Sequence, residues 1–149
     1  FIVHKKESSF YYEIPLAFLD REMLMVTRIA KTANGIGYGG QKINSQVLRW
    51  QKKDEKVLLR IVSYENIAND SLPIYESVRN SNFEPILYSF DIETVNPSDS
   101  SIIIDVTSLF TTDVKALGFP QGRRKDLKIT SLDKSRSFIE SIKSSELIE

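Results

Sequence analysis

The chain has 149 residues, of which 41% are hydrophobic and 27% charged, a composition typical of a globular protein and not of a disordered or fibrous one. Lys and Arg total 20 and Asp and Glu total 20, and this balance argues against a nucleic-acid-binding or membrane-surface role, since both favour a basic excess. The absence of cysteine excludes disulfides and thiolate metal sites. No run approaches the roughly 20 apolar residues of a membrane-spanning helix.

The sequence opens on Phe1-Ile2-Val3 and not on methionine. We therefore expect that an N-terminal segment has been removed, and no signal peptide is visible in the residues that are present. The chain also contains no internal repeat and no internal boundary. It is predicted to be a single non-catalytic domain, residues 1–149, that is a fragment of a larger protein.

Strand-like patterns dominate the first part of the chain. Apolar side chains alternate over residues 10–14, and Pro15 ends this predicted strand. Residues 23–30 are apolar on both faces, with Arg28 as the one charge, which predicts a strand buried on both sides. Further along, residues 46–50 and 57–63 flank a polar stretch that is typical of a hairpin loop.

The clearest hairpin is predicted between residues 86–95 and 101–106, which are joined by the turn-forming stretch 96–100. On the first strand the alternation predicts that Asp91 and Glu93 are exposed. The side chains expected to share the buried face are Ile86, Tyr88, Phe90, Ile92, Ile102, Ile104 and Val106.

Helical signals are short. One helix is predicted from Ser71, with Pro73 in its first turn, and another from Thr107 to about Leu117, ended by glycine. Residues 118–134 are predicted to be an irregular connection, and residues 135–142 fit a helix or a strand equally well. The predicted fold class is therefore mainly β: an antiparallel sheet folded into two layers, with one or two short helices.

Glycine is concentrated in one segment, Gly35-Ile-Gly-Tyr-Gly-Gly40, whose spacing formally matches a dinucleotide-binding fingerprint. That fingerprint requires a following helix, whereas the residues after Gly40 alternate like a strand. We therefore interpret the segment as a loop between strands. Tyr38 and Gly39 at its tip are candidate contact residues.

A second candidate contact region lies near Arg79 and Asn82. These residues either end the first predicted helix and form a turn, or provide a polar binding edge. The basic triplet Arg123-Arg124-Lys125 is predicted to be a solvated loop, with phosphate or carboxylate recognition as the alternative.

Catalytic and metal-binding patterns are weak. His4 is the only histidine, too few for an ordinary zinc site without cysteine, and it is predicted to be a solvated surface residue. No Gly-x-Ser-x-Gly elbow presents a nucleophile to it. The carboxylates Asp91, Glu93 and Asp105 are predicted to lie on solvated strand faces, so we predict no catalytic, cofactor-binding or metal-binding residue in the chain.

Several segments together resemble one known region in their residue identities, order and spacing, over residues 10–143. They are Gly37-Tyr-Gly-Gly40, Asn44-Ser-Gln-Val-Leu-Arg-Trp50, Val78-Arg-Asn-Ser-Asn-Phe-Glu-Pro-Ile86, Phe90-Asp-Ile92, Ile104-Asp-Val-Thr-Ser-Leu-Phe110 and Leu132-Asp-Lys-Ser-Arg-Ser-Phe-Ile-Glu140. The region they resemble is the β-rich part that precedes the catalytic domain in large secreted bacterial zinc-dependent metalloproteases of the gluzincin type. After Lys143 the sequence departs from that family's usual pattern.

The resemblance implies a parent protein with a signal peptide and, further on, a His-Glu-x-x-His helix that binds zinc. It implies a secreted, periplasmic or cell-surface location, with the peptidase domain of the same chain, and a peptide substrate, as partners. The chain itself would be an accessory or scaffold domain that guides substrate or docks to that peptidase domain. The alternative is an independent extracellular binding module for protein or glycan.

Overall fold

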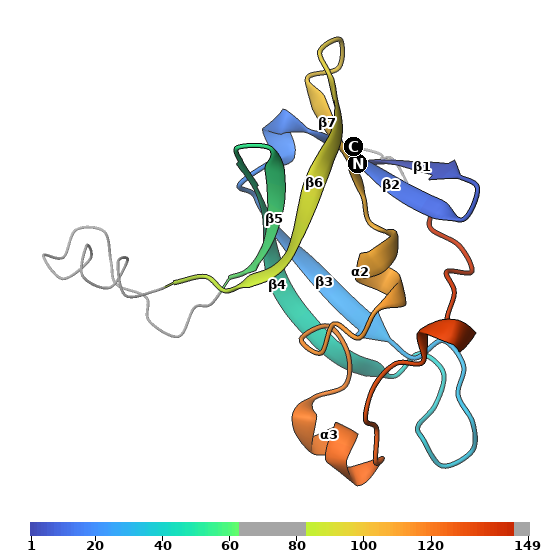
Figure 1. Ribbon diagram of the computed structural model, residues 1–149. Coiled ribbons are helices and arrows are strands. Elements are labelled where there is room, and N and C mark those ends of the chain that lie inside the picture. The colour runs from blue at the N-terminus through green and yellow to red at the C-terminus, as the bar shows by residue number, and fades with distance from the viewer. Residues whose placement is uncertain (63–82, 145–149) are drawn as a thin grey trace, which may run out of the picture.

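Seven antiparallel strands form one curled sheet in the order β1-β2-β7-β6-β5-β4-β3 (Figure 1). The computed structural model describes residues 1–62 and 83–144. The strands are β1 (Ile2–Lys6), β2 (Ser9–Pro15), β3 (Glu22–Arg28), β4 (Lys42–Lys53), β5 (Lys56–Ile61), β6 (Ile86–Asn96) and β7 (Ser101–Asp105). In the described residues the helices are α2 (Thr107–Thr111) and α3 (Gln121–Asp126), with 3-10 turns η1 (Leu16–Phe18) and η2 (Lys134–Arg136). The predicted mainly β, antiparallel class is confirmed.

The curl of the sheet is made by β6, which changes neighbours along its length. Its first half pairs with β5, from Ile86 opposite Arg60 to Asp91 opposite Lys56. Its second half pairs with β7, and the register shifts beside Glu93, which marks a β-bulge. A bulge bends a strand and increases its twist. The predicted hairpin of residues 86–95 with 101–106 therefore holds only for the second half of β6, because the first half belongs to the other side of the curl.

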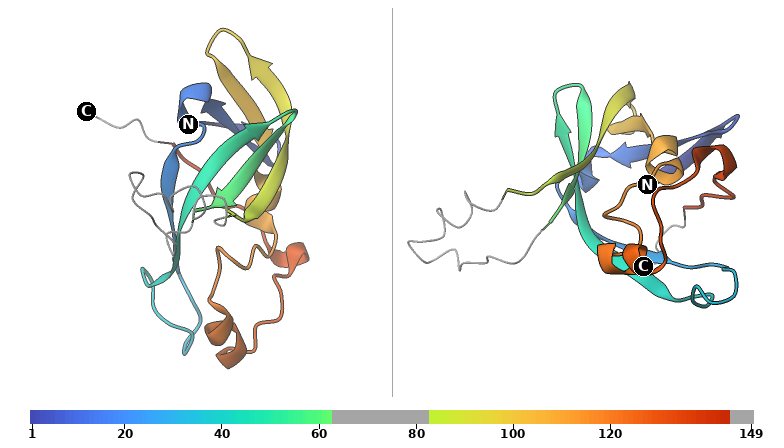
Figure 2. Two further views of the ribbon diagram at one scale, coloured as in Figure 1. Left: turned by 90° about the vertical axis from the view of Figure 1, so that its left-hand side faces the viewer. Right: turned by 60° about the horizontal axis from the view of Figure 1, so that its bottom comes forward.

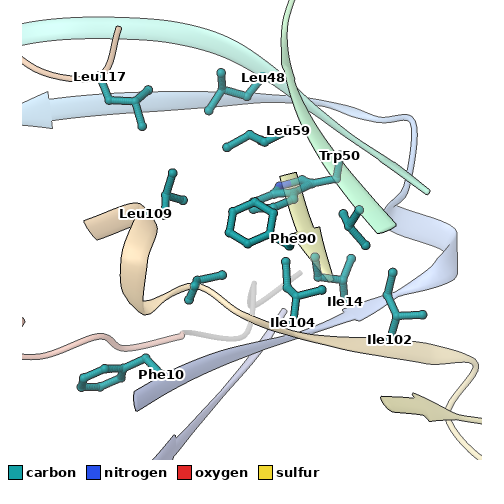
Figure 3. Close-up of a cluster of buried hydrophobic side chains, with 12 residues drawn as sticks. Phe10, Ile14, Leu48, Trp50, Leu59, Phe90, Ile102, Ile104, Leu109 and Leu117 are labelled. Atoms are coloured by element: carbon teal, nitrogen blue, oxygen red, sulfur yellow. The ribbon is translucent and has the colours of Figure 1, made fainter. Parts of the chain in front are cut away.

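The core lies inside this curl, where the two halves of the sheet face each other. Figure 3 shows Trp50 and Phe90 between the aliphatic side chains of the two halves, and the centroids of their rings are 5.6 Å apart. Leu109 of α2 belongs to the same cluster. The buried strand residues of this cluster are Phe10, Ile14, Leu48, Trp50, Val57, Leu59, Phe90, Ile102 and Ile104. The alternation in the sequence predicted Phe90, Ile102, Ile104 and Val106 correctly, whereas Tyr88 and Ile92 are only half-buried and Ile86 at the start of β6 is exposed.

The prediction for residues 23–30 is wrong in part. The segment forms β3, but Leu24 is 68% exposed and Val26 is 40% exposed. Only Met23 and Met25 pack against the core. The physical reason is position, because β3 is the last strand of the sheet and only its inner face reaches the core.

The helix predicted from residue 108 to 117 is only a single turn, α2. Its first residue does not cap it, because the hydroxyl of Thr107 accepts a hydrogen bond from the backbone N–H of Phe10 in β2 (2.8 Å). The hydroxyls of Thr111 and Thr112 donate to the backbone carbonyls four residues earlier. Such local bonds compete with the helical pattern, and the backbone is extended at Thr112.

Two further predictions near the C-terminus are corrected. The segment 118–134, predicted to be irregular, contains α3, which buries none of its residues and therefore shows no hydrophobic periodicity. Residues 135–142 form neither a long helix nor a strand: residues 137–144, which follow η2, have no regular structure, and Phe138 is 83% exposed. The helix predicted from Ser71 lies outside the described residues.

Replacing Phe90 tests the core. We expect Phe90→Ala to lower the free energy of unfolding by about 3–5 kcal/mol, because it leaves a cavity between both halves of the sheet. Val95→Ala on the same strand, where the side chain is 56% exposed, should change it by less than about 1 kcal/mol. Urea unfolding followed by the fluorescence of Trp50 measures both, and equal losses would contradict this placement of Phe90.

Candidate functional site

The glycine segment lies in the loop that connects β3 to β4, residues 29–41, which we call the β3–β4 loop (Figure 2). Gly35, Gly37 and Gly40 have positive φ angles of 84°, 137° and 87°, values that side-chain-bearing residues rarely adopt. The loop runs directly into β4, so no helix follows the fingerprint. The interpretation as a loop between strands is confirmed.

Backbone hydrogen bonds close the base of the β3–β4 loop. The N–H of Ile29 donates to the carbonyl of Gln41 (2.9 Å), and the N–H of Gly40 donates to the carbonyl of Ile29 (2.7 Å). A Cβ atom on Gly39 would lie 2.9 Å from the carbonyl oxygen of Ala30, so the two chains approach each other closely there. Tyr38 belongs to this base, because its carbonyl accepts from the N–H of Gln41 (3.2 Å). It therefore does not lie at the tip of the loop as predicted, but it is 69% exposed. The loop therefore presents one large aromatic side chain from a hydrogen-bonded base.

The other two candidate contact residues, Arg79 and Asn82, lie outside the described residues.

A buried carboxylate, Glu13 of β2, organises the polar cluster that includes the only histidine. The Nε2 atom of His4 lies 2.6 Å from one carboxylate oxygen, and the hydroxyl of Ser101 donates to the other (2.6 Å). Asn96 donates a longer bond to the same oxygen as Ser101 (3.3 Å). The bonds from Ser101 and His4 hold the pKa of Glu13 below its usual range, against the opposing effect of burial.

This geometry does not match a nucleophilic triad. In a triad the imidazole lies between the hydroxyl and the carboxylate, so that it can take the proton of the nucleophile. Here Glu13 lies between His4 and Ser101 and accepts from both. The cluster ties β1, β2, β6 and β7 together. The prediction that His4 is simply solvated needs correction, because its side chain is 47% exposed but bound to Glu13.

The three carboxylates considered for catalysis have separate roles. Asp91 is exposed and forms an ion pair with Lys56, and Glu93 is exposed, as predicted. Asp105 is half-buried and accepts the backbone N–H of Thr107 (2.8 Å) at the start of α2. Within the described residues, no three His, Cys, Asp or Glu side chains are grouped so that they can hold a metal ion.

Arg124 in the basic triplet is not a solvated loop residue. Its guanidinium donates two hydrogen bonds to the carboxylate of Asp113 (2.9 and 2.6 Å) and a third to the carbonyl of Thr130 (3.1 Å). The bonds from Arg124 also hold the pKa of Asp113 below its ordinary value. Arg124 therefore fastens α3 to the chain on both sides of it, whereas Arg123 and Lys125 are exposed.

The sequence analysis missed both polar clusters for the same reason. Glu13 is a diagonal cross-strand neighbour of both His4 and Ser101, and this follows only from the registers of β2 with β1 and with β7. Asp113 and Arg124 are 11 residues apart with no repeating pattern between them. The one signal in the sequence was an acidic residue inside an otherwise apolar and aromatic strand.

The fold defines a mainly β domain built on one curled antiparallel sheet, with a projecting β3–β4 loop. A family model described as "Domain of unknown function (DUF5117)" matches residues 40–147, and the chain belongs to this family. A second model, described as "Domain of unknown function (DUF5118)", matches residues 1–32. No curated protein and no solved structure matches the chain.

The two matched segments share one sheet. The first contains β1, β2 and β3, and the second contains β4 to β7. Strands from the two segments are hydrogen-bonded at two places, β2 with β7 and β3 with β4. The residues between the two matches, 33–39, fall in the β3–β4 loop. Among the described helices none is long and apolar enough to cross a membrane.

The cluster around Glu13 predicts a dependence of stability on pH. Because the pKa of folded Glu13 is lowered, its stabilising contribution is present above the ordinary carboxyl pKa of 4.5 and is lost as the pH falls through the lowered folded value. The stability advantage of the unmodified chain over Glu13→Gln should therefore be largest above pH 4.5 and shrink on acidification. Urea unfolding at several pH values measures it, with Glu93→Gln as the matched control. A pH-independent advantage would contradict the role of Glu13.

The neighbouring arginines Arg123 and Arg124 allow a matched test of the second cluster. Arg124→Lys should lower the free energy of unfolding by about 1–3 kcal/mol, because an ammonium group cannot reproduce the paired bonds to Asp113. Arg123→Lys should change it by less than about 0.5 kcal/mol, because that side chain is exposed. Thermal or urea unfolding of the two variants provides the comparison, and equal effects would contradict the assignment.

Proposed function

We propose that this chain is a non-catalytic accessory domain of a zinc-dependent metallopeptidase, and that it docks to other parts of the parent protein through the β3–β4 loop. The observation that carries the docking role is the ring of Tyr38, 69% exposed on a loop with a hydrogen-bonded base. The peptidase context rests on the resemblance of residues 10–143 to the region that precedes such catalytic domains.

The loop is suited to docking for a physical reason. Ordering a flexible loop on binding costs conformational entropy. This entropy loss is smaller for a loop whose base is already fixed. An exposed tyrosine then supplies a large contact area with few rotatable bonds and a hydroxyl for a hydrogen bond. The adjacent glycines carry no side chains, so a partner can approach the backbone beside the ring.

In this proposal, peptide hydrolysis takes place in a separate domain. Zinc and the general base would belong to the peptidase domain of the parent chain, and the residues of this domain would position that neighbour or its peptide substrate. Export across a membrane to a secreted, periplasmic or cell-surface location belongs to the same proposal.

A binding module for glycan or protein is the second candidate, and one surface feature favours it. A pocket of about 600 Å³ lies between the β1–β2 hairpin, α2 and the segment around η2. Hydroxyl groups line it, and Phe138, 83% exposed, stands at the same place. An exposed ring beside hydroxyl groups offers both apolar and polar contacts to a ligand.

Tyr38 provides the test of docking. In the isolated chain, Tyr38→Ala should change the free energy of unfolding by less than about 0.5 kcal/mol, because the ring is exposed. In the full-length parent protein the same change should weaken docking by about 2 kcal/mol or more, a factor of about 30. We expect kcat/KM for peptide hydrolysis to fall, and the domain junction to become more sensitive to limited proteolysis.

Tyr38→Phe is the matched control, because it keeps the ring and should retain most of the docking. If Tyr38→Ala leaves the kinetics and the proteolysis of the full-length protein unchanged, the loop is only a connection between strands. If the full-length chain contains no His-Glu-x-x-His helix, the peptidase context fails, and binding of soluble glycans to the pocket beside Phe138 then tests the second candidate.

A further inference from the structure

The two edges of the sheet differ in how well they are protected against pairing with another strand. The β1 edge is short, and its residues His4, Lys5 and Lys6 are exposed and polar, a usual protection of sheet edges. The β3 edge has four consecutive apolar residues, Met23 to Val26, with charges only at its ends. In the described residues β3 pairs with β4 alone.

The free side of β3 is also regular. Its register with β4 shifts only between Thr27 and Arg28, where the extra residue, Ile43, belongs to β4. The backbone of β3 is therefore continuous from Glu22 to Arg28, and β3 forms one border of the sheet (Figure 2). A continuous, apolar edge is a template for main-chain pairing with another strand.

The outward face of β3 is complementary to itself when two copies run antiparallel. Its four outward residues are Glu22, Leu24, Val26 and Arg28, in the order acidic, apolar, apolar, basic. A two-fold axis at Met25 would place Glu22 of one copy opposite Arg28 of the second copy, and Leu24 opposite Val26. The same contacts repeat on the other side of the axis.

Both charged ends of β3 are exposed, and both already form bonds within the domain. Arg28 uses one of its five N–H donors, through Nη1, for the carbonyl of Gly40 (2.9 Å). Glu22 accepts a bond from Arg49 (3.0 Å), and a carboxylate has about four acceptor sites. Side chains of both charged residues are exposed.

We propose that the β3 edge pairs antiparallel with β3 of a second copy of this chain, centred on Met25, so that two curled sheets join into one continuous sheet. Main-chain hydrogen bonds supply the pairing, the apolar pairs of Leu24 with Val26 cover its centre, and the Glu22–Arg28 pairs fix orientation and register. The β3–β4 loops then lie at opposite ends of the paired strands. This inference is independent of the proposed docking through Tyr38.

The association is expected to be weak and concentration-dependent, because two seven-residue strands bury less than the roughly 1,200 Å² of a standard interface. Sedimentation velocity of residues 1–149 over a hundredfold range of concentration should show a monomer–dimer equilibrium. Leu24→Lys should raise the dimer dissociation constant at least tenfold, because it places a charge at the centre of the paired edge. Val95→Lys, at an exposed position of β6, is the control and should leave the constant unchanged.

Charge reversal tests the orientation. Arg28→Glu alone, or Glu22→Arg alone, should weaken the dimer, because like charges then face each other at both ends. An equimolar mixture of the two single variants should form a heterodimer, since the carboxylates of one variant face the guanidinium groups of the other. The double variant, Glu22→Arg with Arg28→Glu, should dimerise again with itself. Circular dichroism and melting temperature of each variant confirm that it is folded.

Several outcomes would overturn the proposal. They are a monomer at every concentration, a dimer that Leu24→Lys leaves intact, and a folded pair of single variants that does not associate on mixing. A monomeric chain that nevertheless binds a synthetic peptide of residues 22–28 would also overturn it, because the edge would then accept a peptide strand in place of a second copy.

Discussion

The double pairing of β6 is the constraint on which the rest of the structure depends. One strand of 11 residues is hydrogen-bonded to β5 over its first half and to β7 over its second, and a bulge beside Glu93 lies within the β7 ladder, close to the change of partner. Because β6 turns between its two partners, the sheet curls and its inner faces meet. Phe90 lies where they meet and packs against Trp50 of β4, which belongs to the same half of the sheet. Without this change of neighbours, the apolar faces of β4 and β7 would have nothing to cover them.

Two polar clusters fasten the parts that the core does not reach. Glu13 joins β1 to the end of the β6–β7 hairpin through His4, Asn96 and Ser101. A buried carboxylate that accepts several hydrogen bonds stays charged, so its protonation is coupled to the stability of that side of the sheet. Arg124 holds α3, whose residues are all exposed or half-buried and which no hydrophobic contact would fix. The first cluster contains His4, the only histidine, and in both clusters the geometry is that of a structural contact.

Function is concentrated, in our proposals, on the hairpin formed by β3 and β4. The junction between the two family matches falls in its loop, yet the strands on either side are paired with each other. Residues 1–32 and 40–147 therefore build one sheet together, and neither segment holds all of its strand partners. The hairpin combines an exposed tyrosine in its loop with an apolar edge along its side, which are two different kinds of contact surface. An exposed aromatic side chain suits docking to a neighbouring domain, and an edge strand suits pairing with another strand.

The sequence alone determined the mainly β class, the inner face of β2, β6 and β7, the hairpin around residues 51–56 and the glycine loop, because these follow from local periodicity and turn chemistry. Tertiary structure decided the features that local sequence patterns do not encode, such as edge position, helix length and contacts between distant side chains. Apolar residues on both faces of β3 indicated burial, but its place at the end of the sheet exposes Leu24 and Val26. Thr107 favoured a long helix, but its hydroxyl bonds to β2. The contact of His4 with Glu13 depends on the β1–β2 register. The contact of Arg124 with Asp113 depends on the path of the chain around α3. Each of these depends on which segments become neighbours, and strand order, register and edge position are properties of the assembled sheet.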